Sequence, residues 1–95
     1  MAQLSLLSGY SVQQNLAEYL RQRRKAGKMS RDDLAQRSTV PASTIKKFET
    51  TGQISLRQLL LLWQSLDDLS RIQTLLEPQR RLTHLPATID EVLKG

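Results

Sequence analysis

Polar side chains at the start of one short predicted helix are the residues best suited to recognition chemistry. Ser43 and Thr44 lie just ahead of the adjacent Lys46 and Lys47, and Pro41 precedes all four. A lysine can donate to guanine O6 and N7 or bind a phosphate, and hydroxyl groups bond to several base edges. The pattern favours a helix that contacts nucleic acid; the alternative is a solvated helix face.

Groups that could perform catalysis are few. His84 is the only histidine, cysteine is absent, and we find no Gly-rich phosphate loop and no pair of carboxylates at a useful spacing. A nucleophile with its base, or a metal centre, needs several such groups together. We therefore expect no enzyme activity, catalytic residue, metal or cofactor, and the lack of cysteine excludes disulfides.

Charge is distributed unevenly along the 95 residues, whose net charge is +5. Residues 1–57 contain ten Lys or Arg and four Asp or Glu, a balance of +6, whereas residues 58–95 contain four and five, a balance of −1. A basic half beside a neutral half is typical of a protein that meets a polyanion on one side. The alternative is an ordinary solvated surface.

The elements that must position the polar side chains are predicted to be helices, since no segment alternates in the way a half-buried strand does. Ser11 with Gln14 predicts a capping box that opens a first helix, and Gly27 can end it in a left-handed conformation. The apolar residues at helical spacing on its inward face are Val12, Leu16, Tyr19 and Leu20.

Two short helices follow, and together they predict a helix-turn-helix over about residues 30–49. Ser30 with Asp33 caps the first of them, and Pro41 disfavours helix at Val40 but suits the start of the next helix, from Ala42 to about Thr50. In such a pair the second helix enters the major groove of DNA. The residues expected to hold the pair to the core are Leu34, Ala35, Val40, Ile45 and Phe48.

Gly52 breaks the chain again, and Ser55 with Gln58 predicts a capped fourth helix through Leu66. Asp67 or Asp68 is expected to cap a fifth helix that ends before Pro78. The expected inward residues are Leu56, Leu59, Leu60 and Leu66 in the fourth helix, and Leu69, Ile72, Leu75 and Leu76 in the fifth.

The predicted organisation is an N-terminal extension (1–10), a helix-turn-helix DNA-binding domain (11–77) and a C-terminal tail (78–95) in which Thr88 and Glu91 could cap a short helix. The first residues lack the basic and apolar stretches of a signal peptide, and the longest apolar run, residues 59–63, is too short to cross a bilayer. We therefore expect a cytoplasmic protein that makes no membrane contact.

Four segments share the residue order and spacing of one known family. They are residues 16–25 (Leu-x3-Leu-Arg-x2-Arg-Lys), 29–35 (Met-Ser-Arg-Asp-Asp-Leu-Ala), 44–49 (Thr-Ile-Lys-Lys-Phe-Glu) and 55–60 (Ser-Leu-x2-Leu-Leu). Together they resemble the Cro/C1-type (XRE) helix-turn-helix family over about residues 12–76. The resemblance implies an all-α fold, a compact five-helix lambda-repressor-like bundle with a short C-terminal tail. It also implies a homodimer that binds a near-palindromic double-stranded DNA operator.

The resemblance also implies roles for individual residues. Arg24 and Glu49 match a pair that is buried and ionic in many members; their alternative is an exposed pair. The implied base contacts are Ala42, Ser43, Lys46 and Lys47, and the implied DNA-backbone contacts are Lys28, Ser30, Arg31, Thr44 and Thr51.

Three features depart from the family pattern. Thr39 replaces the usual turn glycine, where a β-branched residue is costly at positive φ. Pro41 replaces the usual Ser or Thr cap, and residues 49–52 are one residue longer than is common. We expect these departures to affect the turn and the reach of the recognition helix.

The segment 48–56 and the tail around residues 89–93 are most similar to the HipB-like branch of antitoxins, which act as autorepressors and pair with a HipA-like kinase toxin. Leu61 and Trp63 fall where the family commonly has polar and small residues, and with Ile89, Val92 and Leu93 they are candidates for a dimer or partner surface. Trp63 could equally fill the core. Alternative functions are a module that neutralises a partner enzyme without DNA, and a stand-alone or prophage regulator.

Overall fold

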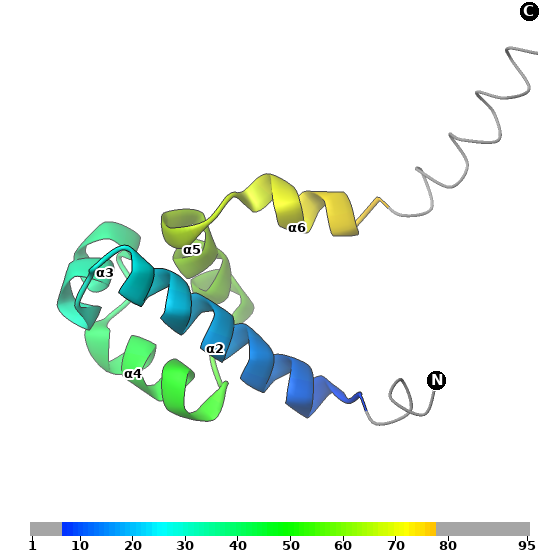
Figure 1. Ribbon diagram of the computed structural model, residues 1–95, viewed down its shortest axis with the longest axis horizontal. Helices are drawn as coiled ribbons and strands as arrows, with labels where there is room; N and C mark the ends of the chain where they lie inside the picture. Colours follow the sequence, from blue (N-terminus) through cyan, green and yellow to red (C-terminus); the bar gives the residue numbers. More distant parts are fainter. Residues whose placement is uncertain (1–6, 78–95) are drawn as a thin grey trace, which may run out of the picture.

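The computed structural model describes residues 7–77, and within that range it consists of five α-helices without any strand. The helices are α2 (Gly9–Ala26), α3 (Arg31–Ser38), α4 (Ala42–Thr51), α5 (Leu56–Leu66) and α6 (Leu69–Leu75). Helices α2, α3, α4 and α5 pack against one another, and α6 packs on α5 and extends away from the others (Figure 1). The described part of the chain is therefore all-α, as predicted.

Side-chain caps begin four of the helices. The hydroxyl groups of Ser30 and Ser55 and the carboxylate of Asp68 accept hydrogen bonds from backbone N–H groups at the starts of α3, α5 and α6. These bonds satisfy donors that have no partner inside the helix. The fourth capped helix is α2, and its cap lies elsewhere than expected.

The capping box predicted at Ser11 and Gln14 is wrong. The N-cap of α2 is Ser8, whose Oγ accepts from the backbone N–H of Ser11 at 3.1 Å, while Ser11 Oγ accepts from the backbone N–H of Ser8 at 3.0 Å. A serine at the third helical position thus performs the reciprocal role that glutamate or glutamine usually fills. As a result, α2 begins at Gly9, ahead of the boundary predicted at residue 11.

Two non-glycine residues adopt left-handed conformations at the helix junctions. Gly27 ends α2 as predicted, but its φ is −81°, and the left-handed residue is the next one, Lys28, with a φ of 56°. Thr39 ends α3 with a φ of 66°, so the strain expected at this position is present. The buried Ser38 supports the turn, since its Oγ accepts from the backbone N–H of Val40 at 3.1 Å.

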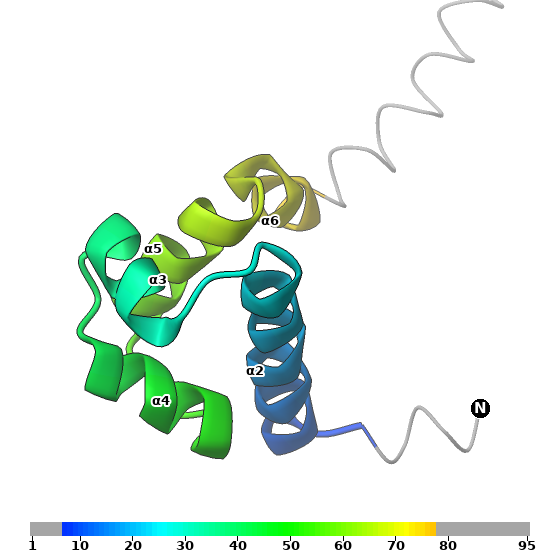
Figure 2. The same ribbon diagram turned by 60° about the vertical axis from the view of Figure 1, so that its left-hand side comes forward.

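The core lies where α2, α3, α4 and α5 converge (Figure 2). Helices α3 and α4 and the turn between them contribute Leu34, Val40, Ile45 and Phe48, each at most 2% exposed, in agreement with the prediction. Ala35 packs at the edge of this cluster. The other buried apolar residues are Ala17, Leu20, Leu62, Trp63 and Leu66.

Helix α5 buries an arc that matches the prediction only in part: Leu66 is buried and Leu59 packs against the core, as predicted. Leu56 is 71% exposed, whereas Leu62, absent from the predicted stripe, is 1% exposed. The reason is that α5 packs against both α2 and α3, so its buried arc is set by two partners. Leu61, expected to fall off the stripe, is partly buried against the core.

Three of the four residues predicted to face inward from α6 are exposed. Leu69, Leu75 and Leu76 are 38%, 68% and 69% exposed, and only Ile72 packs against the core. Helix α6 packs mainly against α5, so a single inward side chain is enough to hold it there. The prediction for Leu69, Leu75 and Leu76 is therefore wrong in this structure.

Candidate nucleic-acid interface

Helix α4 presents a polar face because Ile45 and Phe48 anchor its opposite side in the core. Ser43, Lys46 and Lys47 are exposed, and Ala42 and Thr44 are half-buried. Pro41 makes no side-chain cap at the N-terminus of α4, as its lack of a hydroxyl group predicts. These five of the nine contact positions implied by the resemblance thus lie on one short helix, three of them open to solvent.

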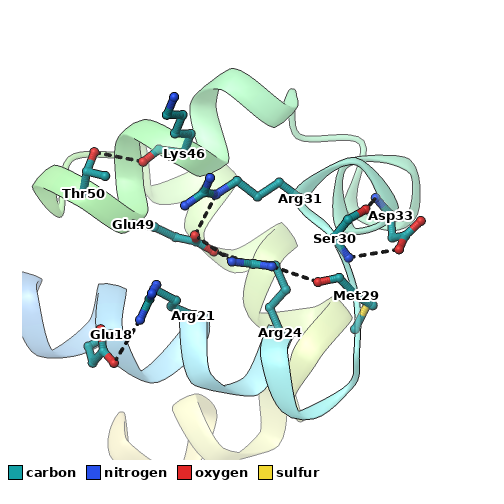
Figure 3. Close-up of polar contacts among 10 residues, drawn as sticks. All are labelled: Glu18, Arg21, Arg24, Met29, Ser30, Arg31, Asp33, Lys46, Glu49 and Thr50. Carbon is teal, nitrogen blue, oxygen red and sulfur yellow. Dashed lines mark hydrogen bonds and ion pairs between the residues drawn. The ribbon is translucent and has the colours of Figure 1, made fainter.

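Glu49 joins three helices through two arginines (Figure 3). Arg24 of α2 donates from Nε to Glu49 Oε2 at 2.7 Å and from Nη2 to Oε1 at 3.1 Å. Arg31 of α3 donates from Nε to Oε1 at 2.9 Å. Burial opposes ionisation of Glu49, but these hydrogen bonds and charges hold its pKa below the ordinary value.

The two arginines differ in exposure. The side chain of Arg24 is 9% exposed and also donates from Nη1 to the carbonyl oxygen of Met29 at 2.8 Å, which fixes the α2–α3 junction. The side chain of Arg31 is 35% exposed, and within residues 7–77 its hydrogen bonding is confined to Nε. Two guanidinium groups against one carboxylate give this cluster a charge of +1, and Asp32 and Asp33 of the first turn of α3 are its acidic neighbours in the sequence.

Ser30 and Lys28 lie next to Arg31, where backbone contacts were implied. Both are exposed, and Ser30 Oγ accepts from the backbone N–H of Asp33 at 3.0 Å. The Asp33 carboxylate accepts in return from the backbone N–H of Ser30 at 2.9 Å, and these bonds lower the pKa of Asp33. An ionised carboxylate at this position opposes an approaching phosphate, so Lys28 and Arg31 are the better phosphate ligands.

Thr51 serves the C-terminal end of α4. Its Oγ1 donates to the carbonyl oxygen of Lys47 at 2.6 Å and accepts from the backbone N–H of Gln53 at 3.1 Å. Gln14 donates to the Thr51 carbonyl at 2.7 Å, and Gln13 donates to that of Gly52 at 3.2 Å. The N-terminal part of α2 thereby holds the C-terminal end of α4, a link that the sequence reasoning missed because Gln14 and Thr51 are 37 positions apart.

A second cluster, also missed, fixes α6 and the end of α5 to α2. The Tyr19 hydroxyl donates to the Asp67 carboxylate, and Arg71 Nη1 donates to both groups at 2.8 Å. The hydrogen bond from Tyr19, with that from Arg71, lowers the pKa of Asp67. Tyr19 and Asp67 are 48 residues apart, so no local pattern signals the contact.

Trp63 lies in the core. Of its two predicted roles, a partner surface and the domain interior, the structure therefore supports the interior. Its exposed fraction is 8%, its ring stacks on Tyr19 with centroids 5.4 Å apart, and its Nε1 donates to the Asp68 carbonyl at 2.9 Å. Leu61 is half-buried and lines a pocket of about 370 Å³ with residues that include Thr39 and Gln64. The tail residues Ile89, Val92 and Leu93 lie outside the described residues, as does His84.

No family model, curated protein or solved structure matches this chain. Among residues 7–77, no helix is long and apolar enough to cross a membrane, and no three His, Cys, Asp or Glu side chains are grouped as metal ligands would be. The candidate interface therefore depends on its own geometry and charge.

Proposed function

We propose that this protein is a sequence-specific DNA-binding transcriptional repressor that reads a near-palindromic operator as a homodimer. The observation that carries the proposal is the pair α3 and α4, in which Ile45 and Phe48 are buried and Ser43, Lys46 and Lys47 face solvent. A short exposed helix with this chemistry fits the major groove, and its hydroxyl and ammonium groups can bond to base edges.

Arg31 supplies the second part of the proposal. It occupies the first position of α3, where its partly exposed side chain and the exposed Lys28 offer two cations to a phosphate. Glu49 holds its Nε, so the rest of the guanidinium is presented in one orientation. In this proposal Arg31 and Lys28 bind phosphates while α4 reads the bases.

The test is a gel shift with the full-length protein and the DNA immediately upstream of its own gene, against a scrambled duplex. The double substitution Lys46→Ala and Lys47→Ala is expected to abolish specific binding and to leave the helical circular dichroism unchanged, because both side chains are exposed. Lys25→Ala with Arg57→Ala, also exposed but outside α4, is the matched control and retains operator selectivity. Full affinity of the Lys46 and Lys47 variant would refute the assigned recognition helix.

A second candidate function is neutralisation of a partner, a HipA-like kinase toxin, by the same chain. The observation that favours it is apolar surface outside α3 and α4, namely the exposed Leu69 and Leu75 of α6 and Leu76 at its C-cap. Exposed apolar side chains grouped on one element are a feature of interaction surfaces. Co-purification with the product of a neighbouring kinase-like gene would support this function, whereas a monodisperse repressor with no such partner would favour the stand-alone regulator.

A further inference from the structure

A cleft of about 270 Å³ lies where α2, α5 and α6 meet, away from the helix-turn-helix, and nothing in the proposed DNA binding uses it. Its aromatic wall is the stacked pair Tyr19 and Trp63, and Val12 on its rim is 41% exposed. No residue of α3 or α4 contributes to it. The lining residues are Val12, Asn15, Leu16, Tyr19, Trp63 and Arg71.

The rim of the cleft carries one cation. Arg71 has a side chain that is 60% exposed, and it uses only Nη1 to bind Asp67 and Tyr19. Within the described residues its Nε and Nη2 make no hydrogen bond. Asp67 already pairs with the charge of Arg71, so a ligand that fits this cleft has apolar side chains for the aromatic wall and an acceptor group, such as a carboxylate oxygen, for the remaining N–H donors of Arg71.

The chain itself contains such a ligand. Residues 89–93 read Ile-Asp-Glu-Val-Leu, with apolar residues at positions one, four and five and two carboxylates between them. On one turn of helix, Ile89, Val92 and Leu93 share a face and the acids flank it. Apolar and acidic groups thus match the wall and the rim cation of the cleft.

Chain length permits the contact within one molecule. Glu77 and Ile89 are twelve positions apart in the sequence, and the chain between them could span about 40 Å when extended. Arg71 lies six residues before Glu77, so the cleft is about 10 Å away along α6 if helical rise is counted. The connecting segment is long enough to return to the cleft of its own chain.

We propose that residues 89–93 dock in the cleft formed by Val12, Tyr19, Trp63 and Arg71 of the same chain. The docked segment covers the aromatic wall, and Asp90 or Glu91 pairs with Arg71. This inference does not depend on DNA binding. It gives the C-terminal tail a binding site on its own chain. A partner protein that binds this cleft would have to displace residues 89–93 from it.

The test uses the full chain, whose lack of cysteine makes Lys94→Cys a unique attachment point for a nitroxide spin label. In one sample, chains that carry both the label and ¹⁵N are diluted into unlabelled protein. Broadening of the Trp63 indole N–H and the Val12 amide, with the Ser43 and Lys46 amides unchanged, is the expected result. In a second sample, ¹⁵N chains without the label are mixed with spin-labelled chains, and no broadening is expected there.

Two outcomes would overturn the proposal. Broadening confined to the mixed sample would mean that the segment binds a second copy, and absence of broadening in both samples would mean that the cleft does not take this segment.

Matched variants separate docking from folding. Val12→Asp places a carboxylate at the cleft rim and should lower the ratio of docked to free tail about tenfold or more. The reason is that the free energy gained by burying one aliphatic side chain corresponds to about a tenfold change in an equilibrium constant. Tyr10→Asp, on the same helix, is 71% exposed and outside the cleft, so it should leave docking unchanged. Val92→Asp tests the tail without touching the folded helices. Equal broadening of Trp63 in the Val92→Asp and parent chains would reject the proposed contact.

Discussion

The carboxylate of Glu49 connects α2, α3 and α4, because arginines from the first two helices donate to it. It is the most buried of the three charges, with a side chain 3% exposed against 9% for Arg24 and 35% for Arg31. Arg24 is therefore bound on several sides inside the protein, whereas Arg31 reaches the surface. In the proposed repressor, this ion-pair network stabilises the fold through Arg24 and contacts DNA through Arg31.

This division of roles predicts two different substitution effects. Glu49→Ala leaves Arg24 buried without its carboxylate and should lower the free energy of unfolding by about 3–5 kcal/mol. Arg31→Ala removes a half-exposed partner and should cost about 1 kcal/mol or less. Urea denaturation measures both. The Arg31→Ala protein should also bind operator more weakly, with a salt slope reduced by about one per removed phosphate contact.

Similar stability losses for Glu49→Ala and Arg31→Ala would contradict this division. The control is Arg21→Ala, whose pair with Glu18 is a 3.6 Å contact between partly exposed side chains on one helix. It should change stability by a few tenths of a kcal/mol.

At the scale of elements, the turn between α3 and α4 combines strain with support. Thr39 is left-handed, a conformation in which its Cβ crowds the backbone, yet the turn is held by the hydrogen bond from the Val40 N–H to Ser38. Val40, on the far side of the turn, is fully buried. Because Ser38 and Val40 are both buried, Thr39 is held in a left-handed conformation that glycine or asparagine would adopt more readily.

Thr39→Asn is therefore expected to stabilise the protein, by about 1 kcal/mol, because asparagine tolerates the left-handed region better than a β-branched residue. Thermal unfolding followed by circular dichroism measures the change. Thr50→Gly, near the end of α4 and exposed, is the contrasting variant and should destabilise by a few tenths of a kcal/mol, the difference between threonine and glycine in helix propensity. A lower melting temperature for Thr39→Asn would show that the threonine side chain contributes more than its strain removes.

At the scale of the whole molecule, the basic surface and the apolar surface belong to different helices. Lys28, Arg31, Lys46 and Lys47 come from α3, α4 and the junction ahead of them, whereas Leu69, Leu75 and Leu76 lie in α6 and at its C-cap. In the proposed repressor, this separation places the operator on the basic surface and a protein partner on the apolar one. It fits a dimer whose two recognition helices reach half-sites about one helical turn apart, roughly 34 Å.

Such a dimer predicts steep salt dependence. If it contacts about six to ten phosphates, its operator affinity should fall by about 10³–10⁵ between about 50 and 200 mM salt. Fluorescence anisotropy at several salt concentrations measures the slope, with a scrambled duplex as control. Specific binding with a flat slope would argue against phosphate contacts by Lys28 and Arg31.

Much of the helical framework was predictable from local patterns. Ser30 with Asp33, Ser55 and Asp68 mark helix starts because their side chains accept from nearby backbone N–H groups. Ser8 was missed because Ser11 resembles a cap in sequence as well, and a local pattern does not distinguish a cap from its reciprocal partner. Helix starts can thus be predicted from contacts within one turn of helix, with errors of a few residues in the boundary.

The sequence by itself determined the all-helical class, the inward residues of the helix-turn-helix and the outward lysines of α4, since these follow from spacing within single helices. Only the tertiary structure decided which arc of α5 is buried, that Trp63 belongs to the core, and that α6 exposes its leucines. It also decided that Arg31 joins Glu49 across 18 residues and that Tyr19 joins Asp67 across 48. The physical reason is that burial and side-chain pairing depend on the neighbours that packing brings to each helix, and helical periodicity carries no information about them.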